Sequence, residues 1–300
     1  MTYADIYKSW QTDPEAFWMQ AAQAITWVKP PSRALDDSKA PIYSWYADAQ
    51  VNTCYNAVDR HVENGRADQV AIIHDSPMTH SVSRMTFAEL QTATASLAGA
   101  LRAQGIGMGD RVIIYMPMVP EALVAMLACA RIGAVHSVVF GGFAAHELAV
   151  RIDDATPKAI IGASCGLEPV RTVAYKPLID GAIAQAKHKV DFTVILQREQ
   201  CRADMTDGFD HDWHAVQQGV TPAECVPVAG DHPAYILYTS GTTGAPKGVV
   251  RATAGHLVAL NWTMKNIYNV NPGEVFWAAS DVGWVVGHSY ICYGPLIHGN

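Results

Sequence analysis

The alternation of short apolar runs with helix-length segments between residues 111 and 197 constrains the fold most. Between the runs lie segments of 10 to 13 residues with helical apolar spacing. Strands that alternate with helices in this way are typical of βαβ units, whose parallel strands are buried on both faces. The sequence therefore predicts an α/β fold, a mostly parallel doubly wound sheet with helices on both faces. The predicted strands are 111–116, 134–140, 158–164 and 191–197, and the predicted helices are 120–132, 144–155 and 176–188.

The segments on either side of this core divide the chain into two expected parts. Helices predicted over 12–25 and 52–65 make residues 1–65 an N-terminal extension wrapped on a larger body, which comprises residues 66–300. The larger body begins with a predicted hairpin and a helix over 86–105. Residues 198–232 are polar and contain several glycines and prolines, which indicates a long surface connection.

Composition and charge exclude several classes of protein. Half of the residues are apolar and only 16% are charged, so much of the chain must be buried. The formal charge of −7 argues against nucleic acid or an anionic membrane as a partner. The longest apolar stretch, 122–130, is far shorter than the roughly 20 residues that span a bilayer. No signal peptide is recognised, and six cysteines without a CxxC spacing predict a cytoplasmic protein with neither a zinc site nor a disulfide framework.

The segment TSGTTGAPKG at 239–248 carries the strongest chemical signal. Its glycines allow backbone N–H groups to turn inward, and its hydroxyls and lysine add donors, so the segment can hold a polyphosphate. An ordinary Gly/Ser/Thr surface connection and a Walker-type NTPase are the alternatives. The second requires a hydroxyl residue directly after the lysine, where this chain has Gly248. The predicted phosphate-binding residues are Thr239, Ser240, Gly241, Thr242, Thr243, Gly244 and Lys247.

At these residues the chain resembles the adenylate-forming superfamily of acyl- and aryl-CoA synthetases, luciferases and peptide-synthetase adenylation domains. The stretches 55–61 (YNAVDRH), 139–143 (VFGGF) and 281–290 (DVGWVVGHSY) are similar to the acetyl/propionyl-CoA synthetase branch. Acetate enzymes of this branch usually have threonine at the position of Val286 and Leu-His at the positions of Val250 and Arg251. Both departures resemble propionyl-CoA synthetases.

The resemblance implies a two-step reaction. A carboxylate attacks the α-phosphorus of ATP with Mg²⁺ to give an acyl-adenylate and pyrophosphate, and coenzyme A then displaces AMP. The phosphate segment would hold the β- and γ-phosphates, and Lys247 is a phosphate neighbour with no assigned catalytic role. No catalytic residue and no protein metal ligand is assigned. Propionate is the expected acid, and an acetyl-CoA synthetase is the alternative, because one methylene group discriminates by only about 1–3 kcal/mol.

The same resemblance assigns further binding residues. Trp284 and Val285 would line the acyl pocket, and Val286 its approach and the coenzyme A path. Gly141, Gly142 and Arg171 would contact coenzyme A. From the residues alone, Trp284 can equally be a core aromatic residue, the glycines a buried turn, and Arg171 a solvated charge. His288 is at least as well explained by a structural hydrogen bond, and a metal site at His211 and His214 is disfavoured because no third ligand is evident.

In the family, further segments follow the part that resembles this chain. They include a Mg²⁺-linked glutamate, a ribose-binding aspartate, a hinge and a C-terminal lid domain that carries the adenylation lysine. We therefore expect this 300-residue chain to be a fragment without the lid domain and with little or no turnover, because positioning of both substrates is lost. The alternative is a truncated, non-catalytic nucleotide-binding or interaction module.

Overall fold

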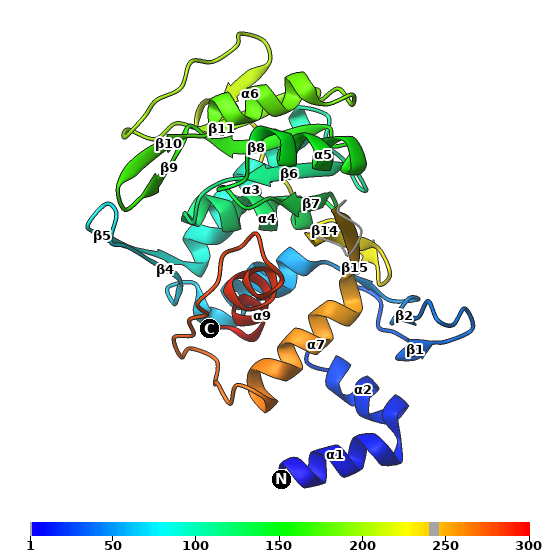
Figure 1. Ribbon diagram of the computed structural model, residues 1–300. Helices are drawn as coiled ribbons and strands as arrows, with labels where there is room; N and C mark the ends of the chain where they lie inside the picture. Colours follow the sequence, from blue (N-terminus) through cyan, green and yellow to red (C-terminus); the bar gives the residue numbers. More distant parts are fainter. Residues whose placement is uncertain (1, 240–245) are drawn as a thin grey trace.

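The structure is a computed structural model that describes residues 2–239 and 246–300 (Figure 1). A twisted sheet forms its centre, and the described residues contribute seven strands in the order β12-β11-β8-β6-β7-β14-β15. All neighbouring strands are parallel except the antiparallel pair β14 and β15. The predicted mostly parallel sheet is thus confirmed. Its strands are β6 (Arg111–Tyr115), β7 (Val135–Val138), β8 (Ala159–Ala163), β11 (Phe192–Leu196), β12 (Asp210–Asp212), β14 (Pro233–Thr239) and β15 (Lys247–Ala252).

Helices cover both faces of the sheet because successive strand residues point to opposite sides. In β6, Val112 and Ile114 belong to the larger core, which includes α3 and α4, whereas Ile113 and Tyr115 pack with α5 and α6. All four side chains are fully buried. This two-sided burial explains why the strands are continuous apolar runs. The helices are α3 (Phe87–Ala103), α4 (Pro120–Arg131), α5 (Ala145–Ala155) and α6 (Lys176–Gln185).

The N-terminal part begins with two helices whose starts are capped by side chains. Thr2 and Asp5 form a capping box at α1, and the carboxylate of Asp13 accepts a hydrogen bond from the N–H of Ala16 at the start of α2. Helix α1 was not predicted; none of its residues is buried, although Tyr3, Ile6, Tyr7 and Trp10 share one face. The elements are α1 (Tyr3–Thr12), α2 (Pro14–Ala22), β1 (Leu35–Asp36), β2 (Ser44–Trp45) and β3 (Gln50–Val51).

Between this part and the sheet, the predicted helix over 52–65 is present but wound as π-type turns. These are η1 (Tyr55–Asp59) and η2 (Val62–Arg66), and the backbone leaves helical geometry at Gly65 with φ of 80°. The predicted hairpin follows as β4 (Val70–Ser76) and β5 (Ser81–Thr86). A second hairpin, β9 (Cys165–Glu168) with β10 (Arg171–Ala174), leads into α6.

The predicted surface connection over 198–232 is only partly correct. Strand β12 extends the sheet beside β11, a short helix η3 (Ala215–Gln217) follows, and Trp213 between them is buried. Strand β13 (Val228–Ala229) then pairs with β3 of the N-terminal part. The polar composition of the segment gave no sign of these contacts. The Asp210 carboxylate is buried because it forms an ion pair with Lys176, so β12 needs no apolar residue at this position.

The last described segment packs against one face of the sheet at β7 and β14, where Tyr293 lies against the rings of His136 and Tyr235. It consists of α7 (Thr253–Asn266), α8 (Val285–Gly287), η4 (His288–Tyr293) and α9 (Gly294–His298). Figure 1 shows α7 running from the sheet towards α2, with α9 at the centre of the view. None of the helices in the described part of the chain combines the length and apolar character needed to cross a lipid bilayer.

Candidate functional site

The order of the strands places a topological switch point between β7 and β14, which we call the crevice. From β7 the chain returns across β6 to β8, whereas from β14 it continues to β15 on the opposite side. Because β7 and β14 are parallel, both strands end at the same edge of the sheet. Ligands of doubly wound proteins bind at such a switch point, outside the carboxyl ends of the strands. The motif at 139–143 directly follows β7, and the motif at 239–248 begins at Thr239, the last residue of β14.

The turn after β7 is held by two tyrosines. The Tyr115 hydroxyl donates to the carbonyl oxygens of Gly141 and Phe143, at 3.2 and 2.7 Å. Its ring lies 5.1 Å from that of Tyr175, and a Cβ on Gly141 would be 2.6 Å from the Tyr175 oxygen. Gly141 is therefore required by close packing, which supports the alternative of a buried turn for this residue. Gly142, by contrast, is exposed.

The segment 281–286 lies directly against this turn. The Asp281 carboxylate accepts from the N–H of Gly283 at 2.7 Å, and burial raises the pKa of this carboxyl group. A Cβ on Gly283 would be 2.9 Å from the backbone nitrogen of Phe140. The Trp284 ring lies 5.9 Å from the ring of Phe140 and 6.2 Å from that of Phe143. The structure therefore brings together two motifs that are separated by about 140 residues in sequence.

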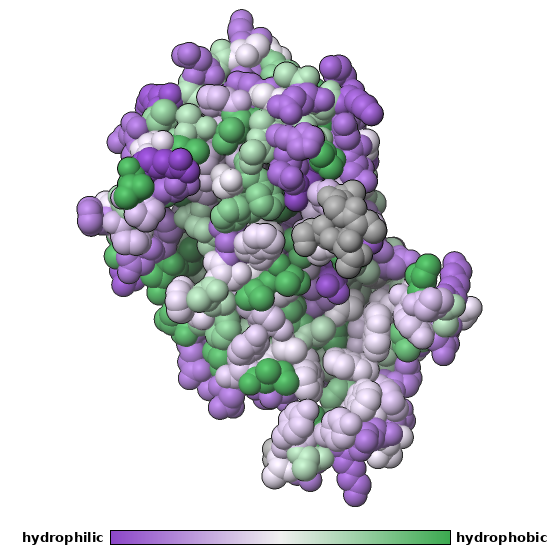
Figure 2. Space-filling model, in the orientation of Figure 1, coloured by the Kyte–Doolittle hydropathy of each residue, from purple (hydrophilic) through white to green (hydrophobic). Residues whose placement is uncertain are grey.

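Trp284, Val285 and Val286 present an apolar surface to the outside. They are 46%, 47% and 44% exposed, so Trp284 is not the core aromatic residue that the residues alone allowed. Hydrophobic and neutral residues gather over the middle of this face of the molecule, while its periphery is mostly hydrophilic (Figure 2). An exposed apolar patch of this kind marks a surface that can bind an apolar group.

A buried arginine on α5 links the two strand ends. The Arg151 guanidinium is 4.7 Å from the centre of the Phe143 ring and 5.6 Å from that of the Tyr238 ring. It is paired with Glu147 at 2.9 Å, and the Tyr238 hydroxyl donates to Asp154 at 2.6 Å. A positive charge thus lies next to the last residues of β14, where the predicted phosphate segment starts.

The phosphate segment itself is described only at its ends. Thr239 and Lys247 are cross-strand partners of β14 and β15, and both are exposed. The predicted residues Ser240, Gly241, Thr242, Thr243 and Gly244 lie outside the described residues. The register nevertheless shows that the chain enters and leaves this segment at neighbouring positions on the same sheet edge.

Arg171 lies on β10 of the second hairpin, outside the crevice. Its guanidinium pairs with Glu168 at 2.7 Å, and both side chains are exposed. This geometry fits the solvated charge that was the alternative for this residue. The hairpin is connected to the crevice through Tyr175, the residue that follows β10 and packs under Gly141.

The rings of His288, His136 and Tyr235 pack together in the core beside the site loop. The His288 ring stacks on that of His136 at 5.6 Å and lies tilted against that of Tyr235 at 4.6 Å. Its Nδ1 hydrogen-bonds with the carbonyl oxygen of Trp284 at 3.1 Å, and burial lowers its pKa to about 4. His288 is therefore neutral at physiological pH and anchors the site loop, which agrees with a structural role.

The site contains residues that sequence reasoning did not single out. Tyr115, Tyr175, Arg151 and Asp281 hold the two loops or lie between them. One signal was available: Arg151 interrupts the apolar face of α5 formed by Leu148, Ile152 and Ala155, and a charge at a core position requires a partner. The tyrosines gave no such signal, because tyrosine is common in buried strands and at their ends.

Proteins usually hold Mg²⁺ through one or two carboxylates together with substrate phosphates. The described residues of this site carry carboxylates at Asp281, Glu147 and Asp154. Within residues 2–239 and 246–300, the cluster with metal-ligand spacing is Cys54, Asp59 and Cys225, which lies elsewhere. His211 and His214 are not members of this cluster.

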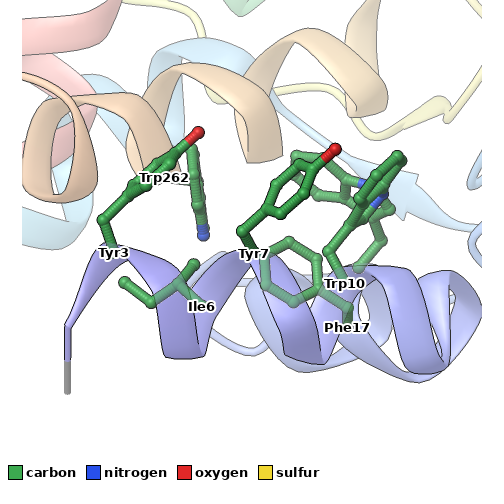
Figure 3. Close-up of a pocket in the computed structure, with 7 residues that line it drawn as sticks. Tyr3, Ile6, Tyr7, Trp10, Phe17 and Trp262 are labelled. Atoms are coloured by element: carbon green, nitrogen blue, oxygen red, sulfur yellow. The ribbon is translucent and has the colours of Figure 1, made fainter.

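An aromatic pocket of about 210 Å³ lies far from these loops, between α1, α2 and α7 (Figure 3). Figure 3 shows Tyr3, Tyr7 and Trp10 projecting from one face of α1 towards Trp262 of α7. Its described lining residues are aromatic apart from Ile6 and include no carboxylate, imidazole or ammonium group, so they offer no charged group and no acid or base near neutral pH. The crevice at β7 and β14 is therefore the better candidate.

Comparison with known proteins identifies the family of the chain. Acyl-CoA synthetase short-chain family member 3, mitochondrial, of Bos taurus is 53% identical over 290 residues, which cover 96% of this chain and 42% of that protein. Propionate–CoA ligase of Salmonella typhimurium is 43% identical over 302 residues, covering 100% of this chain and 48% of the ligase. Acetoacetyl-CoA synthetase from Streptomyces lividans has a similar structure, with a TM-score of 0.89 and 25% identity over all of this chain and 45% of that chain.

The chain spans about half of the length of the curated relatives it matches. Two family sequence models divide it: acetyl-coenzyme A synthetase N-terminus matches residues 3–57, and AMP-binding enzyme matches residues 58–300. The second match covers most of the chain, including every loop of the crevice described above. The chain therefore belongs to the AMP-binding enzyme family.

Proposed function

We propose that this chain is part of a short-chain acyl-CoA synthetase that converts propionate, ATP and coenzyme A into propionyl-CoA, AMP and diphosphate through an acyl-adenylate. One observation carries the proposal. The loop after β7, the loop at 281–286 and the end of β14 meet at one switch point, where they combine an apolar patch with a buried cation. These are the features needed to hold a short acyl group beside a polyphosphate.

Binding of the ATP phosphates is assigned to the segment between β14 and β15. Lys247 at its end is exposed, and Arg151 lies below the last residues of β14. Both cations favour the negative charge that develops on the phosphates during adenylation. Mg²⁺ is expected to enter with the phosphate oxygens of ATP, because it usually keeps several waters and is bound through one or two carboxylates together with substrate phosphates. Residues 240–244 are included on the resemblance alone.

The acyl group is assigned to the apolar patch of Trp284, Val285 and Val286. Valine at 286 has about the volume of threonine but lacks its hydroxyl group, so this position cannot hydrogen-bond to water or to a polar substrate atom. The patch therefore favours the larger, more apolar propionate over acetate. The discrimination should be modest, because one methylene group corresponds to about 1–3 kcal/mol.

Coenzyme A is assigned to Gly142, Gly141 and Arg171 on the opposite side of the loop after β7. The exposed Gly142 allows a ligand to approach the backbone closely. A phosphate of coenzyme A would have to replace the Glu168 carboxylate at Arg171. We also propose residues 1–65 as an N-terminal extension and 66–300 as the start of the nucleotide-binding body.

Nucleotide binding is tested by titration calorimetry of the 300-residue chain with ATP and Mg²⁺. Lys247→Ala should weaken ATP binding by about 10- to 100-fold, because it removes a charged donor worth about 1.5–3 kcal/mol. Lys265→Ala is the matched control, since Lys265 is an exposed lysine at the end of α7. Equal affinities in the two variants would contradict the assignment of the phosphate segment.

Acyl preference is tested without turnover, with the propyl and ethyl esters of AMP as mimics of the two adenylates. The chain should bind the propyl ester about 10-fold more tightly, and Val286→Thr should reduce this ratio towards one. Val249→Thr, a similar change at an exposed position of β15, should leave the ratio unchanged. A preference that survives Val286→Thr would place the acyl pocket elsewhere.

Turnover is a separate question, which ATP–pyrophosphate exchange with propionate answers. We expect little or no exchange from these 300 residues, because the binding residues described here do not include a catalytic group that contacts the α-phosphate. Robust exchange would contradict this expectation while supporting the synthetase assignment. Nucleotide binding without exchange would agree with both the proposal and the non-catalytic alternative, which the AMP-ester preference then separates.

A further inference from the structure

A cluster of two thiols and a carboxylate lies on the side of the molecule where the N-terminal part meets the body. The Sγ atoms of Cys54 and Cys225 and a carboxylate oxygen of Asp59 all lie within 4.8 Å of one another. Cys54 and Asp59 lie at either end of η1, whereas Cys225 belongs to the chain leading to β13. Residues far apart in sequence therefore place two sulfur atoms within reach of each other.

The surrounding contacts hold the cluster in place. The Arg131 guanidinium of α4 donates to both Asp59 oxygens, at 2.7 and 2.9 Å, and to the Ala223 carbonyl at 2.6 Å. The Asn52 amide donates to the carbonyl oxygen of Val226 at 2.8 Å. Both backbones that carry the cysteines are thus fastened to their surroundings within two residues of the thiols.

The positive charge of Arg131 limits the chemistry that is possible at the cluster. Its Nη1 atom is 3.5 Å from the Cys54 sulfur as well as 2.7 Å from Asp59. A divalent cation at this position would face a fixed positive charge at contact distance, in competition for the same carboxylate. The three potential ligands therefore do not make a favourable metal site, and a reaction between the two sulfur atoms remains.

One of the two thiols can be reached from outside. A cavity of about 200 Å³ is lined by Cys225 together with Trp27, Asn52 and Tyr55. Cys225 is partly exposed, whereas Cys54 is fully buried behind it. A small oxidant that enters this cavity meets Cys225 first, and the resulting oxidised sulfur then lies beside Cys54.

We propose that Cys54 and Cys225 are a redox-sensitive pair that hydrogen peroxide converts into a disulfide. The Cys225 thiolate attacks peroxide, which forms an S–O bond and releases water after proton transfer, leaving a sulfenic acid. The Cys54 sulfur then attacks the Cys225 sulfur, forms the S–S bond and displaces a second water. Two thiols and one peroxide thus give one disulfide and two water molecules.

The cross-link would join the two family segments of the chain covalently. Cys54 lies in the segment that matches acetyl-coenzyme A synthetase N-terminus, and Cys225 in the AMP-binding segment. Because the closed loop is long, oxidation should raise the melting temperature by several degrees, as the cross-link restricts the unfolded chain. Sulfur atoms of a disulfide are about 2.0 Å apart, so both side chains must turn towards each other.

The rate of oxidation should depend strongly on pH. The hydrogen bond to Cys54 and burial raise the pKa of the Cys225 thiol, and the negative charge of Asp59 acts in the same direction, against the positive charge of Arg131. Tyr55 is the other titratable group on this cavity. Since the thiolate is the nucleophile, the pair should resist peroxide near pH 7 and react faster as the pH is raised to 9.

The test is peroxide treatment of the 300-residue chain at pH 7 and 9, followed by non-reducing peptide mapping. We expect a peptide pair that joins residues 54 and 225, reversible by dithiothreitol, with faster formation at pH 9. Cys201, a partly exposed cysteine outside the cluster, is the internal control and should not appear in a cross-linked peptide. Oxidation of Cys225 to a sulfinic acid without any 54–225 peptide would contradict the proposal.

Two variants separate the order of steps, and the mapping of the wild-type chain decides the proposal even if either variant folds poorly. In Cys54→Ser, the sulfenic acid on Cys225 should persist and be trapped by dimedone. In Cys225→Ser, Cys54 should not be labelled, because it is shielded from solvent. Dimedone labelling of Cys54 in Cys225→Ser would show that oxidant reaches Cys54 directly, which contradicts the proposed entry through Cys225.

Discussion

Two buried arginines illustrate how the protein separates scaffold from site. Arg131 and Arg151 are 3% and 5% exposed, yet their carboxylate partners differ. The Asp59 side chain is 8% exposed and receives both guanidinium nitrogens of Arg131, whereas the Glu147 side chain beside Arg151 is 47% exposed. Arg131 joins α4 to the N-terminal part, and Arg151 lies against the rings of Phe143 and Tyr238.

The difference teaches that burial alone does not define the role of a charge. Removing one partner of a fully desolvated pair leaves an uncompensated buried ion, so the Arg131 pair is a structural requirement. Where the carboxylate stays hydrated, the arginine can be lost at a smaller structural cost and its charge remains available to a ligand. The following predictions test this contrast.

The largest effect is expected at the scaffold. Arg131→Met should lower the free energy of unfolding by about 3–5 kcal/mol, because it leaves the Asp59 carboxylate buried without a partner. Urea unfolding followed by circular dichroism measures the loss. The double variant Asp59→Leu with Arg131→Met should recover more than half of it, and additive losses would show that packing, not the unpaired charge, dominates.

A smaller effect is expected from the turn at the site. Gly141→Ala should cost about 1–3 kcal/mol of unfolding free energy, because the new Cβ would lie 2.6 Å from the Tyr175 oxygen. Gly107→Ala is the control, since its Cβ would meet its nearest neighbour only at 3.7 Å. Equal stabilities of the two variants would mean that the site edge is not fixed by packing.

The pH dependence of the free energy of unfolding tests one buried histidine of the N-terminal part, His61, and one of the site, His288. Burial lowers the pKa of both His61 and His288 to about 4, from an ordinary value of 6.5. Below pH 6.5 the unfolded chain binds protons that the folded protein does not, so the free energy of unfolding should fall from pH 6.5 to 4. The fall should be about 1.4 kcal/mol per pH unit for each histidine.

The variants His61→Gln and His288→Gln should each reduce this slope by about one proton, measured by urea unfolding at pH 4.5, 5.5 and 6.5. An unchanged slope in His288→Gln alone would show that the site loop admits water to its histidine. That result would sharpen the contrast between a rigid scaffold and a more open site.

The smallest effect is expected from Arg151→Met. Because Glu147 remains hydrated, the loss of this pair and of the cation–π contacts with Phe143 and Tyr238 should lower the free energy of unfolding by about 1–2 kcal/mol. The same urea experiment measures it beside Arg131→Met. A loss as large as that of Arg131→Met would remove the distinction between the two arginines.

Prediction from sequence succeeded where local pattern and structure coincide. Strands β6, β7, β8 and β11 were found because each is an apolar run buried on both faces. Strands β12 and β15 were missed, since β12 reads Asp-His-Asp and β15 is exposed over most of its length. Their pairing comes from neighbours in the sheet and leaves no periodicity in their own residues.

The site was predictable only in its motifs. The stretches at 139–143, 239–248 and 281–290 were recognised individually, but their mutual position was not. The contact of Trp284 with Phe140 and Phe143, and the place of Arg151 between Phe143 and Tyr238, depend on the order of strands in the sheet. Arg171 shows the reverse case, since its surroundings contain an ion pair that the motif did not reveal.

By itself, the sequence determined the α/β class, the approximate bounds of the central strands and helices, and the resemblance to adenylate-forming enzymes. Only the tertiary structure decided that Trp284 is exposed, that Arg151 faces two loops and that Cys54 lies beside Cys225. The reason is physical. Helix and strand signals arise from neighbours a few residues apart, whereas these contacts arise from strand order and packing, which no local periodicity encodes.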